Sequence, residues 1–131
     1  MQLFENAVKL RGFLGNDAQA PSSDNIQNDS FAVLLLATVS GMWDLGNNKW
    51  IPRTDWHRII CPGPYFCGMV RGMRRGDYLE IEGEIRDFEE DRTVVVVGKR
   101  FPAKHATYTV YAIRITRLDP PDALVDFGED G

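Results

Sequence analysis

Trp56 and Arg58 lie in the stretch 53–60, which is Arg-Thr-Asp-Trp-His-Arg-Ile-Ile. In a β-strand successive side chains point to opposite faces, so Trp56 and Arg58 would share one face and His57 would lie on the other. An aromatic ring beside a fixed positive charge can hold an unstacked nucleotide base and its phosphate. The same pair could instead be a half-buried Trp with an Arg packed over it. Taken alone, the stretch favours this second interpretation, because strand aromatics usually pack.

Few residues are candidates for nucleophilic or metal chemistry: Asp55, His57, Cys61, Cys67 and His105. The first three share strand parity, but a proline follows Cys61 at once. The Cys-x5-Cys spacing matches none of the usual short zinc spacings. The motifs G-x-S-x-G, H-E-x-x-H and the phosphate loop do not occur. We therefore expect no enzyme, no bound metal and no cofactor.

The totals are those of one ordinary soluble domain. The chain has 131 residues, of which 44% are hydrophobic and 26% charged. The longest apolar run, 31–39, has the length of a strand and not of a membrane span, so no membrane contact is expected. The first six residues carry Glu5 and no basic residue, so we expect no secretory signal and a cytoplasmic protein. The two cysteines would be thiols there.

Acidic residues are concentrated at the end of the chain. The net charge is −4, but five of the 19 acidic residues follow Arg117, after which there is no Lys or Arg. Residues 1–118 therefore hold 14 acidic residues against all 15 basic ones. We predict a near-neutral domain over 1–118 and a short acidic tail over 119–131.

The elements that would position these residues are mostly strands. Alternating or continuous apolar patterns predict strands over 3–14, 31–40, 53–60, 77–86 and 108–118. Residues 41–48 are expected to be the turn of a hairpin, and 16–30 a polar loop. Gly83 suggests a bulge or a sharp bend within its strand. Residues 87–106 form a long excursion or a hairpin between the last two strands.

One segment has helical periodicity. From a start near Pro64, apolar residues recur at three- and four-residue spacing: Tyr65 or Phe66, then Met69, Val70 and Met73. Arg71, Arg74 and Arg75 would lie on the other side, up to a stop at Gly76. One helix between the third and fourth of five strands is the order of the OB-fold, a Greek-key barrel. The predicted fold is therefore all-β, with a short helix between strands 3 and 4 and a long 4–5 loop or hairpin.

Four blocks of residues then carry a resemblance. Residues 6–17, 36–38, 54–60 and 75–86 resemble, in the same order, the bacterial single-stranded DNA-binding proteins. The resemblance implies an OB-fold protein, usually a homotetramer, that wraps single-stranded DNA in replication, recombination and repair without catalysis. By position, Trp56 and Trp43 correspond to base-stacking tryptophans. Arg58, Arg75 and Arg86 fall on basic, DNA-facing positions, and His57 falls on a subunit-interface histidine.

The chain also departs from this family. Pro62 stands where relatives carry a stacking Phe, and a third Trp after the fourth strand is missing, with Phe88 the aromatic residue close by. The Gly/Pro/Gln-rich linker and the terminal acidic motif ending in Pro-Phe do not occur. Replication or repair proteins are candidate partners, but the terminal acidic motif through which relatives would bind them does not occur in this sequence.

The first hypothesis is sequence-nonspecific binding of single-stranded DNA. Trp43, Trp56 and Phe88 would stack bases at about 1–3 kcal/mol each. Basic residues would follow the phosphates; they are Lys9, Arg11, Arg58, Arg75, Arg86, Lys99, Arg100 and Lys104. The alternative is an OB-fold adaptor or accessory protein with weakened DNA binding, favoured by the missing aromatics, the low charge of the body and the acidic run 89–91. Dimer and tetramer both stay open.

Overall fold

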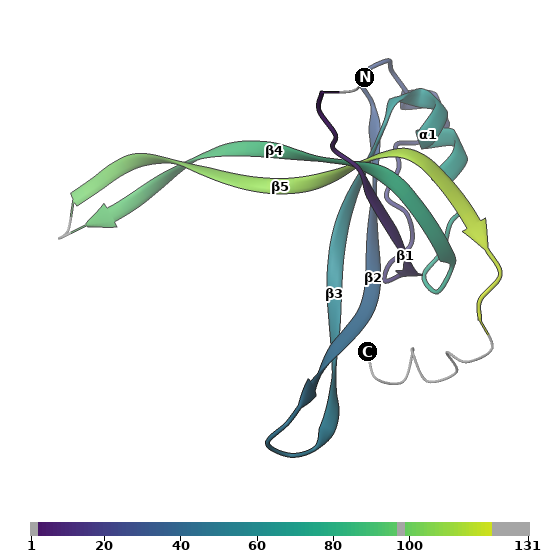
Figure 1. Cartoon of the computed structure of the whole chain (residues 1–131). Coiled ribbons are helices and arrows are strands. Elements are labelled where there is room, and N and C mark those ends of the chain that lie inside the picture. Colours follow the sequence, from purple (N-terminus) through teal and green to yellow (C-terminus); the bar gives the residue numbers. More distant parts are fainter. Residues whose placement is uncertain (1–2, 97–98, 122–131) are drawn as a thin grey trace.

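Five strands close into a barrel in the computed structural model, which describes residues 3–96 and 99–121, with backbone only for 88–107 (Figure 1). The strands are β1 (Val8–Leu14), β2 (Phe31–Asp44), β3 (Lys49–Pro62), β4 (Tyr78–Val96) and β5 (Lys99–Leu118). Their order around the barrel is β1-β2-β3-β5-β4, and β4 pairs again with β1. The β3–β5 pair is parallel and the others are antiparallel. The predicted five-stranded all-β barrel is confirmed.

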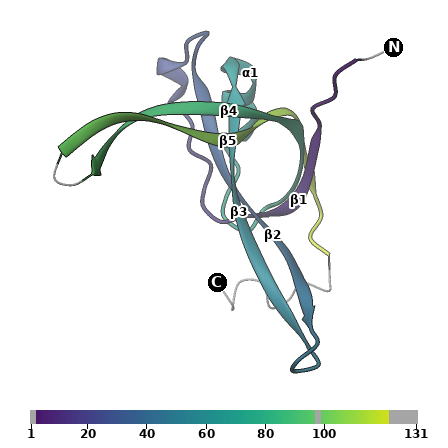
Figure 2. The ribbon, with the colours of Figure 1, turned by 60° about the vertical axis from the view of Figure 1, so that its left-hand side comes forward.

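The barrel interior is filled by the apolar side chains that point inward at alternate positions along each strand. Leu34, Leu36, Ile59, Leu79 and Ile81 are each at most 1% exposed. The short helix α1 (Gly63–Val70) follows β3, as predicted, and its buried Cys67 and Val70 join the same core. Figures 1 and 2 show α1 at one end of the barrel and the β2–β3 hairpin leaving the other end.

Gly83 marks the bulge predicted within the fourth strand. The β4–β5 register shifts between Glu82 and Gly83. A side chain at Gly83 would collide with the backbone carbonyl of Tyr111, so only glycine lets β5 pass this close. The shift bends β4, which closes the barrel against β1 and then continues outward with β5 (Figure 2).

Two hairpin arms extend from the barrel (Figure 1). The β2–β3 pairing runs to Asp44 and Lys49, so the expected turn over 41–48 is wrong and the turn is limited to 45–48. Trp and Ile residues favour strand over the intervening positions and outweigh Gly41 and Pro52. Asp44 closes the tip by accepting hydrogen bonds from the backbone N–H of Gly46 at 3.0 Å and the side-chain amide of Asn47 at 2.7 Å.

The second arm contains the long excursion predicted between strands 4 and 5. Of the two alternatives, the hairpin is correct: β4 and β5 pair from Tyr78 with Leu118 to Val96 with Lys99. The β1 strand is shorter than the predicted 3–14. Before it, the Asn6 side chain donates to the carbonyl of Ile85 at 2.6 Å and accepts from its N–H at 2.9 Å, which replaces backbone pairing.

The helix ends earlier than predicted, so its expected basic side is wrong. Arg71, Arg74 and Arg75 follow α1 instead of lying along it. Asp77 accepts a hydrogen bond from the N–H of Arg74 and Asp17 accepts one from the N–H of Arg75, both at 2.9 Å. These carboxylates replace helical acceptors, and the glycines at 68 and 72 weaken helix propensity by about 1 kcal/mol each. Across the described ranges, no helix is long and apolar enough to cross a membrane.

Candidate nucleic-acid interface

The outward side of β2 and β3 carries all three tryptophans of the chain. Leu36 and Ile59 point into the barrel, so Trp43, Trp50 and Trp56 lie on the opposite, outward face. Trp43 and Trp50 pair directly across the arm, and Trp56 follows nearer the barrel. Their exposed fractions are 49%, 55% and 52%. We call this surface, with Arg58 beside Trp56, the tryptophan face.

Two of these rings rest on glycines. A methyl group at Gly15 would overlap the six-membered ring of Trp56. A methyl group at Gly41 would come within 2.6 Å of Cζ2 of Trp50. In the described structure, none of the three tryptophans contacts another aromatic ring. Each of the two seated rings is therefore supported from one side by backbone, while half of its surface is left to solvent.

The positive charge of Arg58 is not neutralised within the described residues. Arg58 is exposed on β3, two residues from Trp56, and has no carboxylate partner there. Arg86 lies on the same outward surface two strands further on. On β5, which lies between β3 and β4, Tyr111 pairs with Ile60 of β3 and Thr109 pairs with Arg86 of β4. The guanidinium of Arg86 stands 4.7 Å from the ring centroid of Tyr111 and also pairs with Glu84. Two strand spacings separate the Arg58 and Arg86 backbones, roughly 10 Å.

Arg75 approaches the tryptophan face through the segment 15–17. Its backbone N–H donates to Asp17, two residues after the glycine that carries the ring of Trp56. Its exposed side chain has no carboxylate partner among the described residues. The structure thus brings together Trp43, Trp56, Arg58 and Arg86, with Arg75 attached at their edge.

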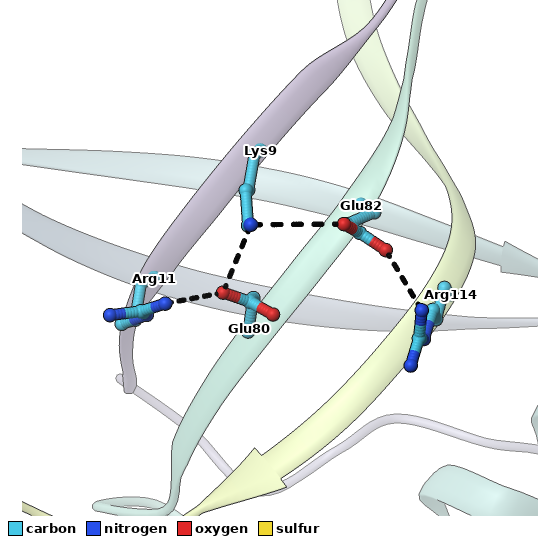
Figure 3. A network of polar contacts seen from close by, with 5 residues as sticks. All are labelled: Lys9, Arg11, Glu80, Glu82 and Arg114. Atoms are coloured by element: carbon cyan, nitrogen blue, oxygen red, sulfur yellow. Dashed lines mark hydrogen bonds and ion pairs between the residues drawn. The ribbon is translucent and has the colours of Figure 1, made fainter.

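Lys9 and Arg11 lie elsewhere, on the outward side of β1 and β4. Figure 3 shows them with three neighbours in one network, which we call the ion-pair face: Lys9, Arg11, Glu80, Glu82 and Arg114. Arg11 donates to Glu80 at 2.6 Å, and Lys9 lies 3.7 Å from Glu80 and 3.9 Å from Glu82. The hydrogen bond from Arg11, followed by the charges of Lys9 and Arg11, holds the pKa of Glu80 below its ordinary value. These cations are already matched by carboxylates.

His57 is half-buried on the barrel side of β3, opposite in direction to Trp56. Its Nε2 lies 2.8 Å from Oγ1 of Thr38, so the two side chains share a hydrogen bond across the strands. The division of the stretch 53–60 into two faces is as predicted from strand parity. The subunit-interface role of His57 stays a prediction.

The two cysteines are placed for packing. Cys61 and Cys67 are both fully buried in the barrel core, as free thiols. Burial, with a smaller contribution from Cys67, raises the pKa of Cys61 to about 12, so its thiol stays neutral near pH 7. In the part of the chain that the structure describes, no three His, Cys, Asp or Glu residues form a group that could hold a metal ion.

Four predicted site residues lie on the β4–β5 arm, where side chains are outside the described part of the structure. Phe88 pairs in register with Thr107, Lys104 with Asp91, Arg100 with Val95 and Lys99 with Val96. Their predicted contacts with nucleic acid stay predictions.

Two aromatic residues of the surface, Trp50 and Tyr111, were not predicted as site residues. Trp50 lies as far after the Gly46-Asn47 turn as Trp43 lies before it, which is the pattern of a cross-strand pair. The pairing was hidden because the turn was expected to begin at Gly41. Tyr111 becomes relevant only when β3 and β5 lie side by side, a contact that no local pattern predicts.

Comparison with known proteins gives a consistent result. The chain is 31% identical over 90 residues to single-stranded DNA-binding protein 1 of Chlorobaculum tepidum, covering 67% of this chain and 54% of that protein. It is 33% identical over 82 residues to the single-stranded DNA-binding protein of Bacteroides thetaiotaomicron, covering 62% and 50%. The chain thus spans about half the length of these relatives. No protein-family model matches it.

The fold comparison agrees. A solved Plasmodium falciparum SSB complex with ssDNA matches with a TM-score of 0.64 at 18% identity, covering 91% of this chain and 99% of that one. Barrel, helix position and outward aromatic face thus define an OB-fold protein. The resemblance seen in the sequence is confirmed: the chain has an OB-fold and is similar to single-stranded DNA-binding proteins.

Proposed function

We propose that this protein binds single-stranded DNA without sequence preference. The observation that carries the proposal is the tryptophan face, where three half-exposed indole rings share one outward surface of an OB-fold barrel with Arg58, which has no carboxylate partner among the described residues. Bases have a π-face in common, so stacking on such rings tolerates any sequence. The names of the two curated relatives support the same ligand.

In the proposed mechanism, Trp43 and Trp56 stack bases while arginines hold the phosphates between them. Arg58 is adjacent to Trp56. Arg86 lies against the ring of Tyr111, and its ion pair with Glu84 would have to open before it could hold a phosphate. Arg75 would act at the edge, near the segment 15–17. Lys9 and Arg11 would contribute less, because Glu80 and Glu82 already match their charges. Phe88 and the basic residues of the β4–β5 arm would extend the contact.

Further parts of the proposal follow from the resemblance. The protein would act in replication, recombination or repair, as a homo-oligomer in the cytoplasm, without catalysis. Replication or repair proteins would be its protein partners. A gel-filtration mass of two or four chains, lowered by His57→Tyr, would support assembly through the His57 side of β3. A monomeric mass for the unmodified protein would contradict it.

Titration with oligo-dT tests DNA binding directly. Tryptophan fluorescence should be quenched at low salt, and the affinity should fall steeply when salt is added, because phosphate contacts release counterions. Fluorescence that stays constant, together with no change in the anisotropy of a labelled oligo-dT, would refute the proposal.

A second candidate function is an OB-fold adaptor with weakened DNA binding. It is favoured by the ion-pair face, where two of the expected phosphate-binding cations are engaged by carboxylates. A partner pulldown with and without nuclease treatment separates the two functions. Partners that survive nuclease digestion favour the adaptor, and partners that are lost favour DNA binding.

A further inference from the structure

We propose that Trp50 is a third base-stacking residue, so that the bound strand extends along the outward face of the β2–β3 arm beyond Trp56. This inference rests on the proposed function. It concerns a residue that the family resemblance does not assign, in a chain where Pro62 replaces one expected aromatic and a Trp expected after the fourth strand is missing.

The first argument is geometric. Trp50 is 55% exposed, somewhat more than either Trp43 or Trp56, and points to the same outward face as both. Trp50 lies six positions before Trp56 in β3, which corresponds to roughly 20 Å of strand. A strand of DNA that contacts Trp56 and Trp43 therefore has to pass beside Trp50, because Trp43 and Trp50 are directly opposite each other.

The second argument is that the ring is held and still free to bind. Cζ2 and Cε2 of Trp50 lie 2.6 and 2.7 Å from where a methyl group on Gly41 would be, so the ring rests on backbone. Within the described residues it contacts no other aromatic ring and pairs with no cation. A ring that is already ordered loses little conformational entropy when a base stacks on it.

The third argument comes from the surroundings. Val39 and Thr54 pair between the Trp43–Trp50 pair and Trp56 on this face, and neither carries a charge. Among the described residues, nothing acidic on the outward side of the arm would repel a phosphate. The opposite side of the same arm is different, with Ser40, Met42, Ile51 and an Arg53–Asp55 ion pair at 3.0 Å. The two sides of one ribbon therefore provide an internal control.

Two substitutions on neighbouring residues test the proposal. Trp50→Ala should weaken oligo-dT binding about tenfold. Trp50→Phe, which keeps a ring, should retain most of the affinity. Ile51→Ala is the matched control, because Ile51 is the next residue of β3, is 41% exposed and faces the other way. Equal affinity for Trp50→Ala and the unmodified protein, or an equal loss for Ile51→Ala, would overturn the inference.

A second measurement does not depend on the stability of the arm. In the variant Trp43→Phe/Trp56→Phe, Trp50 is the one remaining tryptophan of the three in the chain. Its emission should be quenched when labelled oligo-dT binds. If this variant binds oligo-dT without quenching, the role of Trp50 is refuted and the proposed function stands. If the unmodified protein does not bind oligo-dT, the proposed function itself is refuted.

Discussion

The tryptophan face and the ion-pair face are both outward surfaces of the same barrel, but they differ in whether their basic side chains are paired with carboxylates. On the ion-pair face, Lys9, Arg11 and Arg114 alternate with Glu80 and Glu82 across three strands (Figure 3). On the tryptophan face, Arg58 has aromatic and uncharged neighbours. A count of basic residues does not distinguish the two surfaces, although only one of them leaves a positive charge available.

This difference indicates on which surface phosphate contacts would give favourable binding free energy. A phosphate that contacts Arg11 must compete with a carboxylate 2.6 Å away, whereas one that contacts Arg58 displaces only water and salt ions. The side chain of Glu80 is 17% exposed and that of Arg11 is 56% exposed, so the carboxylate is the sheltered member of the pair. We therefore propose that the ion-pair face stabilises the sheet and that the tryptophan face binds the ligand.

The largest expected effect is the loss of two rings. Trp43→Ala/Trp56→Ala should weaken oligo-dT binding roughly a hundredfold, because each stacked base contributes about 1–3 kcal/mol. Labelled oligo-dT anisotropy measures it. The control is Tyr65→Ala, since Tyr65 is 72% exposed but lies on α1, at the other end of the barrel from the arm (Figure 1). A loss below threefold, or an equal loss for Tyr65→Ala, would remove the distinction between the two faces.

The next effect compares one arginine from each face. Arg58→Ala should lower the salt dependence of binding by about 0.7 in the slope of log affinity against log salt, the amount expected for one phosphate contact on a single strand. Arg11→Ala should leave that slope unchanged, because Glu80 already matches its charge. Titrations at several salt concentrations give both slopes. If Arg11→Ala lowers the slope as much as Arg58→Ala does, the ion-pair face also binds DNA.

A smaller effect is expected from the glycine beneath Trp56. Gly15→Ala should push the indole ring outward, because the added methyl group would overlap it, and should weaken oligo-dT binding several-fold. The emission spectrum of Trp56, in a variant with the other two tryptophans replaced by Phe, should shift as well. Gly68→Ala is the control, since a methyl group there meets nothing within 4 Å. Unchanged affinity and spectrum for Gly15→Ala would mean that the position of the Trp56 ring against Gly15 does not matter for binding.

Much of the barrel was predictable from local patterns. The alternation of Leu79 and Ile81 with glutamates predicts one buried face, and the structure buries both leucine and isoleucine completely. The bulge at Gly83 was also predictable, because a glycine within a strong strand pattern indicates a special backbone conformation. Local propensity and tertiary packing agree at these positions.

The errors lie where tertiary contacts outweigh local propensity. Gly41 was expected to begin the turn, but it pairs with Pro52 inside the arm. The basic side of the predicted helix was lost because the carboxylates of Asp17 and Asp77, one of them distant in sequence, take the backbone N–H groups of Arg75 and Arg74. For the site, strand parity predicted the faces of Trp56 and His57, but it could not distinguish a paired cation from an unpaired one. That distinction depends on the β1–β4 register.

The smallest expected effect tests whether the ion-pair face has the stabilising role assigned to it. The pKa of Glu80 is lowered in the folded protein, first by the hydrogen bond from Arg11 and then by the nearby charges. A lowered carboxyl pKa contributes stability above the ordinary pKa of Glu, about 4.3, and this contribution is lost as the pH falls through the lower folded value. Glu80→Gln should therefore have a smaller free energy of unfolding than the unmodified protein at pH 7, and the two denaturation curves should approach each other as the pH falls through the lowered pKa of Glu80.

The pair partner supplies the control for this measurement. Because Arg11 acts through Glu80, Arg11→Ala should cost little further stability in the Glu80→Gln background, and a double-mutant cycle at pH 7 measures that coupling. A stability difference that is the same at pH 3 and pH 7 would mean that Glu80 acts through packing and not through its charge. Oligo-dT affinity that rises strongly in Glu80→Gln would mean that the released Lys9 and Arg11 reach DNA, so that the carboxylates of the ion-pair face restrain binding there.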